Sequence, residues 1–97
     1  MAMHLNSNFT ENKPLQTKKL FSPIEGSVIT IKLEANAEMK EHMTKTPALL
    51  LGIVGEVVFE NEKGIKEIIC QGDYIEIEPD VKHWLLAKTD SNLILIK

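Results

Sequence analysis

Short apolar segments that alternate with polar residues run along most of this chain, and this pattern predicts β-strands. Residues 27–34 place Ile29, Ile31 and Leu33 on one face, and residues 74–78 alternate in the same way. A period of two residues is typical of a strand with one buried face. No stretch carries the apolar stripe of a confident amphipathic helix. The pattern therefore predicts an all-β domain of about eight to ten short strands, arranged as a sandwich or barrel.

Glycine and turn residues divide the apolar segments. Residues 48–59 form an almost continuous apolar ribbon, in which Gly52 and Gly55 predict a bend or a close approach of backbones. Gly64 is expected to supply a positive φ in a hairpin turn. Further strands are expected at residues 65–70, 74–78, 83–88 and 93–97, with turns at 71–73, 79–80 and 90–92.

The chain is long enough for one domain. Its 97 residues would leave two separate cores too small to fold. Residues 1–14 are polar and lack a period, so we expect a flexible N-terminal arm or an edge strand, followed by a single domain over residues 15–97. A domain of this size leaves much apolar surface exposed, which favours a homodimer in which edge strands or the arm cross between protomers.

Charge and cysteine usage exclude several classes of partner. The net charge is −3 and all 11 basic residues are lysine, so we expect no nucleic-acid partner. The longest apolar run, residues 47–54, is far shorter than the ~20 residues of a membrane-spanning helix, so no membrane partner is expected. Cys70 is the only cysteine, which excludes an intrachain disulfide and favours the cytoplasm. We expect Cys70 to be a small, half-buried strand residue.

Two segments, residues 40–59 and 72–84, resemble the two halves of the signature of cupins, a family of small β-barrels. The first family motif has two histidines two residues apart, a later glutamate, and a strand that ends at a turn glycine. This chain has Lys40, His42 and Gly55 in that order. The resemblance covers roughly residues 25–97 and implies a jelly-roll barrel, or double-stranded β-helix, with no substantial helix.

The second family motif is a glycine, five residues, a proline, and a histidine five residues beyond it. Gly72 and His83 keep this spacing, with Glu78 at the proline position and Pro79 displaced by one residue. Within the family, the chain looks most like small single-domain cupins of unassigned function.

The resemblance also implies a set of residues that face the barrel cavity. Residues two apart on a strand face the same side, so Lys40 and His42 are expected to project inward, with Met39, Glu41 and Met43 outward. His83 is expected inward from a neighbouring strand, close to His42. Trp84 is expected to pack between sheets or protomers, or to line the mouth of the pocket. The expected ligand-binding residues are Lys40, His42, His83 and Trp84.

A divalent metal is a second expectation, with His42 and His83 as its ligands. The full family site supplies three histidines and one carboxylate, whereas this chain has Lys40 at the first position and no acid from residue 43 to 55. Two imidazoles are fewer than the three protein ligands usual at catalytic sites. Glu38, Glu76 or Glu78 would have to complete a site for zinc, iron, manganese or nickel.

Three functions therefore remain open from the sequence. The barrel could bind a small molecule, such as a small acid or compact anion, with the imidazoles and Lys40 as its polar contacts. It could be a metal-dependent enzyme of the dioxygenase, isomerase or decarboxylase kind, based on His42 and His83. It could instead be a dimeric scaffold without catalysis, in which the histidines only pack. The sequence does not decide whether the protein is an enzyme.

Overall fold

The computed structural model describes residues 3–21 and 26–97, and the chain in these ranges is nearly all β. The first two residues of the expected arm and residues 22–25 of the expected domain lie outside the described residues. A short 3₁₀ helix, η1 (Leu5–Asn8), precedes the strands. The strands are β1 (Leu15–Phe21), β2 (Val28–Leu33), β3 (Glu38–His42), β4 (Ala48–Val54), β5 (Val57–Asn61), β6 (Lys66–Ile69), β7 (Tyr74–Ile77), β8 (His83–Ala87) and β9 (Ser91–Ile96).

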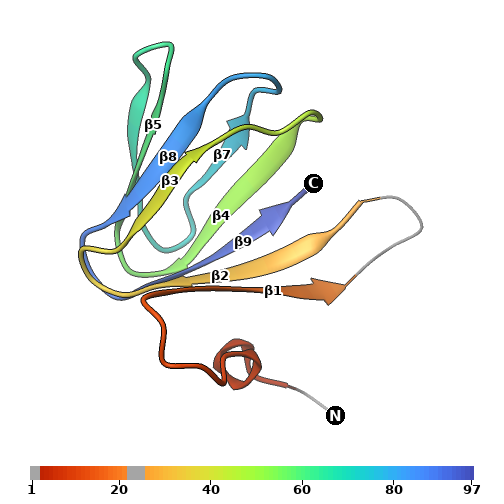
Figure 1. The fold of residues 1–97 in the computed structure, drawn as a ribbon, viewed down its shortest axis with the longest axis vertical. Coiled ribbons are helices and arrows are strands. Elements are labelled where there is room, and N and C mark those ends of the chain that lie inside the picture. The colour runs from red at the N-terminus through yellow and green to blue at the C-terminus, as the bar shows by residue number, and fades with distance from the viewer. Residues whose placement is uncertain (1–2, 22–25) are drawn as a thin grey trace.

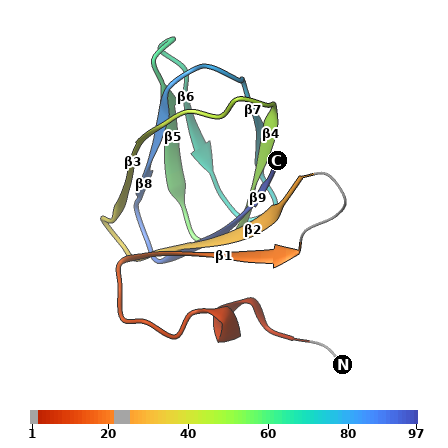
Figure 2. The same cartoon turned by 45° about the vertical axis from the view of Figure 1, so that its right-hand side comes forward.

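The strands form two antiparallel sheets that face each other as the halves of a barrel (Figures 1 and 2). The five-stranded sheet has the order β1-β2-β9-β4-β7, and the four-stranded sheet has the order β3-β8-β5-β6. Chain neighbours often lie in different sheets, as β3 and β4 do, which is the crossing pattern of a jelly roll. The fold class expected from the sequence is confirmed. No helix among the described residues is long and apolar enough to cross a membrane.

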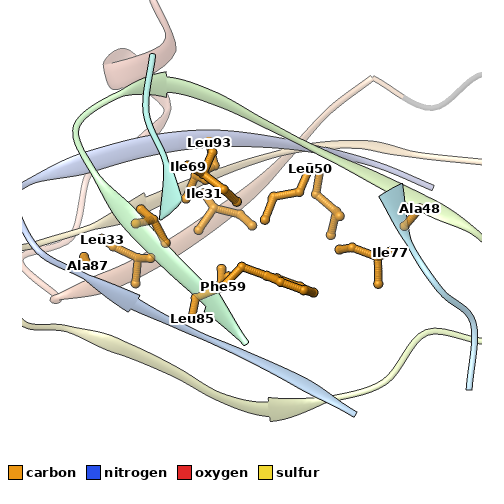
Figure 3. Packing of buried hydrophobic residues seen from close by; sticks show 12 residues of the cluster. Ile31, Leu33, Ala48, Leu50, Phe59, Ile69, Ile77, Leu85, Ala87 and Leu93 are labelled. Atoms are coloured by element: carbon orange, nitrogen blue, oxygen red, sulfur yellow. The ribbon is translucent and has the colours of Figure 1, made fainter. Parts of the chain in front are cut away.

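Apolar side chains from both sheets fill the interior. Figure 3 shows them meeting between the strands, with Phe59 and Leu85 of one sheet near Leu50 and Ile77 of the other. This packing gives the barrel a solid apolar core. The buried cluster consists of Ile31, Leu33, Ala48, Leu50, Val57, Phe59, Ile69, Ile77, Leu85, Ala87, Leu93 and Leu95.

The alternation in the sequence matches the observed strands closely. The expected strands at 27–34 and 74–78 appear as β2 and β7, and their inward residues are those that the period predicted. The apolar ribbon of residues 48–59 divides into β4 and β5, because Gly55 adopts a φ of 90° between them. Gly64 has the expected positive φ, at 83°. The sequence pattern did not identify β1, which pairs with β2 at the edge of the sheet.

Cys70 is not the half-buried strand residue that the sequence suggested. It is exposed and follows β6, which ends at Ile69. Its backbone N–H donates to the carboxylate of Asp73 at 2.9 Å, a contact that stabilises the turn into β7. Aspartate side chains often form such hydrogen bonds to nearby backbone groups in turns. The strand β6 therefore ends at Ile69, one residue earlier than expected.

The N-terminal arm lies against the outer surface of the five-stranded sheet. The side-chain amide of Asn92 in β9 donates to the Oδ1 atom of Asn6 in η1 at 3.0 Å. Figures 1 and 2 show the arm running beside β1, on the side away from β2. The division between arm and domain after residue 14 stays a prediction, although β1 begins at Leu15.

We predict that Gly52→Ala destabilises the protein by about 2–3 kcal/mol, because an added methyl group would overpack a close backbone contact. A Cβ atom at this position would meet the carbonyl oxygen of Cys70 and the side chain of Ile69. Gly64→Ala is the control: its Cβ would meet open space, so only its positive φ carries a cost, of about 1 kcal/mol. Urea unfolding measures both, and equal losses would contradict the close approach at Gly52.

Candidate functional site

Two histidine side chains meet at one end of the barrel. His42 is the last residue of β3 and His83 the first of β8, and the two are direct partners in the antiparallel pairing. Their ring centroids are 5.5 Å apart with an interplanar angle of 85°, an edge-on arrangement. His83 is only 5% exposed, whereas His42 is exposed. The structure therefore brings together the two imidazoles that the sequence singled out.

An irregularity in β3 makes this meeting possible. Met39 is the partner of Leu85, and His42 is the partner of His83. A step of three residues along β3 therefore matches a step of two residues along β8. The register shift between Met39 and His42 is a β-bulge, which lets both side chains face the interior despite their odd spacing. Met39 packs against the buried cluster. The expectation that Met39 projects outward is therefore wrong.

The same bulge places Lys40 on the outer surface, away from the histidines. Lys40 and Glu41 lie opposite Trp84 in the pairing, and Glu41 forms an ion pair with the exposed Lys82 at 3.4 Å. Lys40 is exposed and lines a surface groove of about 340 Å³ together with Trp84. Its expected inward direction was wrong because strict alternation from His42 does not hold across a bulge.

Trp84 also lies on the outer face. It follows His83 in β8 and precedes Leu85, and both of those residues are buried, so alternation directs Trp84 away from the interior. The indole is half-buried, and its Nε1 donates to the carboxylate of Glu60 at 2.8 Å. Trp84 does not pack between the two sheets. The four expected ligand-binding residues thus separate into an inner pair of histidines and an outer pair, Lys40 and Trp84.

His83 sits in an apolar setting that disfavours its charged form. Its ring stacks on Phe59, with centroids 5.6 Å apart and planes 24° from parallel. Burial lowers the pKa of His83 below its usual value, a hydrogen bond with the Val81 carbonyl opposes this, and His42 adds a smaller lowering. The contact from Nδ1 to the Val81 oxygen is long, at 3.4 Å. A neutral ring that donates from Nδ1 leaves Nε2 as an acceptor.

Other polar groups at this end of the barrel were not identified from the sequence. Asn61 is the partner of His83 on β5, but its Oδ1 already accepts from the backbone N–H groups of Lys63 and Ile65. The Thr44 hydroxyl is buried and has no hydrogen-bond partner among the described residues. The Thr44 carbonyl accepts from the Asp80 N–H at 2.8 Å, beside Val81. The sequence feature that could have identified Thr44 was its position two residues after His42, because residues two apart on an extended chain face the same side.

The donor set does not fit a three-ligand metal centre. Within residues 3–21 and 26–97, no three side chains of His, Cys, Asp or Glu are grouped to hold a metal ion. Glu38, Glu76 and Glu78 are all exposed. Glu38 precedes the bulge on the outer side of β3, and Glu78 pairs with Lys63 at 2.7 Å. Binding of a metal by His42 and His83 alone stays a prediction.

Solved structures with the same architecture were found. A cupin superfamily protein from Desulfitobacterium hafniense DCB-2 has a TM-score of 0.85 and 16% identity, covering 100% of this chain and 89% of that chain. An RmlC-like cupin from Shewanella frigidimarina NCIMB 400 has a TM-score of 0.78 and 22% identity, with 86% and 74% covered. A conserved protein of unknown function from Streptococcus pyogenes has a TM-score of 0.83 and 14% identity, with 99% and 84% covered.

These likenesses show that the chain has the cupin fold, and at such identities they extend to the fold alone. No protein-family model and no curated protein matches the sequence. The expected recognition of a small single-domain cupin barrel is confirmed at this level.

We predict that the protein loses stability as the pH falls below about 6.5, because the unfolded chain protonates His83 more readily than the folded chain does. The loss continues down to the lowered pKa of the folded state and then levels off, with a slope of at most about 1.4 kcal/mol per pH unit from this residue. Urea unfolding between pH 8 and pH 5 measures it.

The matched variants are His83→Leu and His4→Ala, the second of which alters an exposed histidine in the arm. The acid-dependent loss should shrink in His83→Leu and persist in His4→Ala. An identical pH profile in the wild type and His83→Leu would show that the buried imidazole is not the group responsible.

Proposed function

We propose that this protein binds a small molecule at the end of the barrel where His42 and His83 meet, with these two residues as the polar contacts. The observation that supports this is a 5% exposed imidazole whose one side-chain hydrogen bond among the described residues is long, set edge-on to a second imidazole beside an apolar core. A buried polar group that is poorly satisfied by the protein is a cost to folding, and a ligand that completes its hydrogen bonding offsets that cost.

The arrangement favours a small carboxylic acid as the ligand. A neutral His83 accepts a hydrogen bond through Nε2, and the ring of His42 offers a second imidazole nitrogen beside it. Burial disfavours charge on His83, whereas His42 is exposed and open to an incoming ligand. Lys40 contributes nothing to this selectivity, since it lies on the other face of β3.

A metal-dependent enzyme is supported less well, because no third ligand reaches the histidines among the described residues. A purely structural role for the histidines would leave the buried Thr44 hydroxyl without a hydrogen-bond partner among the described residues. A cytoplasmic location accords with the single exposed cysteine and is part of the proposal.

We predict that a thermal-shift screen at pH 6 with acetate, malonate, succinate and glucose finds stabilisation by at least one carboxylate. His42→Ala and His83→Ala should each abolish that stabilisation, since each removes one polar contact. Lys40→Ala and Trp84→Ala are the controls from the outer face and should retain it. The screen is repeated with a chelator to separate direct binding from metal-mediated binding.

Stabilisation that survives both histidine substitutions would contradict the proposal, as would its loss in Lys40→Ala or Trp84→Ala alone. Stabilisation that disappears with the chelator would instead support a metal between the imidazoles.

A further inference from the structure

A cavity of about 280 Å³ lies between the β5–β6 hairpin and β7. Strands β6 and β7 are edge strands of different sheets, and in the described part of the chain no strand pairing joins them. The space between them is therefore bordered mainly by side chains. Phe59 of β5 and Ile75 of β7 are two of these, and Ile65, which precedes β6, is a third. Each sheet thus contributes an apolar wall to the cavity.

Glutamates form the polar part of the same cavity. Glu67 is the cross-strand partner of Phe59, which is 3% exposed, so the Glu67 side chain leaves β6 on the inner face. Glu76 lines the cavity from β7. Glu78 is a third lining residue and is paired with Lys63 at 2.7 Å. Neither Glu67 nor Glu76 forms an ion pair within residues 3–21 and 26–97. The cavity therefore presents two carboxylates that no described lysine neutralises.

A buried amide lines the cavity independently of the glutamates. Asn61 ends β5 and is only 8% exposed. Its Oδ1 accepts from the backbone N–H groups of Lys63 and Ile65, which fixes the orientation of the amide. Its Nδ2 has no hydrogen-bond partner among the described residues and is not enclosed by protein atoms, so this donor opens onto the cavity. An amide N–H₂ group donates to an acceptor such as a ligand oxygen.

We infer that this cavity binds a small apolar amine that carries a carbonyl oxygen, such as an amino-acid amide. The ammonium group of the ligand lies between the carboxylates of Glu67 and Glu76 and donates to both. The carbonyl oxygen accepts from Nδ2 of Asn61. The apolar body of the ligand packs against Ile65 and Ile75. A few placed polar groups in a mostly apolar wall are typical of small-molecule sites.

The charge of the cavity separates this ligand class from others. A second carboxylate on the ligand meets repulsion from the two glutamates, so an amide binds better than a free acid. No three acidic, histidine or cysteine side chains of the described ranges are grouped to hold a metal ion, whereas an ammonium needs only separate acceptors. Neither His42 nor His83 lines this cavity, so the inference goes beyond the proposed function and does not depend on it.

Proton–nitrogen correlation NMR of the full chain at pH 7 tests this inference with four ligands of similar size. L-Leucinamide has the ammonium, the carbonyl oxygen and the apolar body, so it should bind and shift the side-chain N–H₂ resonances of Asn61. 3-Methylbutylamine lacks the carbonyl, 4-methylpentanamide lacks the ammonium, and L-leucine adds a carboxylate. Each of these three should bind at least about fivefold more weakly, because each loses a contact or gains a repulsion.

Three variants separate the contacts. Glu67→Gln should weaken the binding of L-leucinamide at least about fivefold, because it removes one charged acceptor. Glu34→Gln is the matched control, since it makes the same change at an exposed residue outside the cavity, and it should retain the affinity. Asn61→Asp keeps the Oδ1 acceptor of the hairpin and removes the Nδ2 donor. The preference for L-leucinamide over 3-methylbutylamine should therefore disappear in Asn61→Asp.

Absence of L-leucinamide binding would overturn the inference, as would equal affinities for L-leucinamide and L-leucine. Equal weakening in Glu67→Gln and Glu34→Gln would show a general attraction to an acidic protein and would also contradict the site. Resonance shifts that centre on His42 and His83 and leave Asn61 unchanged would place the ligand at the histidines and would overturn the assignment of this cavity.

Discussion

A β-strand can direct either Met39 or His42 into the barrel, but not both, unless it gains a residue between them. The register shift in β3 supplies that residue. As a result Met39 packs against the buried core, and the ring of His42 still contacts the ring of His83 edge-on. It also turns Lys40 and Glu41 outward, where Glu41 pairs with Lys82. The composition of the candidate site, two imidazoles without an ammonium, follows from this one local irregularity.

The apolar core limits where chemistry can occur. Side chains from both sheets fill the interior, and the buried polar residues Thr44, Asn61 and His83 gather at the end of the barrel where β3 finishes and β8 begins. Phe59 belongs to the core and also stacks on His83. The packing of the barrel therefore influences the protonation state of His83. Water is displaced from one side of the ring, and the neutral imidazole is favoured.

Local patterning was sufficient to predict most of the fold. The period of two in β2 and β7, and the glycines that end β4 and shape the β5–β6 hairpin, act within a few residues, so the sequence shows them directly. The closeness of His42 and His83 was also anticipated, through the resemblance to cupins. The direction of Lys40 was not, because a bulge depends on how β3 fits the length of β8 and leaves no glycine in the sequence as a marker. Cys70 was misplaced for a related reason, since a hydrogen bond to Asp73 ends β6 early.

The candidate site exists only if the two imidazoles are in contact. Nuclear Overhauser spectroscopy on protein labelled only at histidine and phenylalanine measures it directly. The structure predicts cross-peaks between the rings of His42 and His83 and between those of His83 and Phe59, with none from His4 to either histidine. Cross-peaks from His83 to Phe59 without any to His42 would place β3 in a different register and would remove the proposed site.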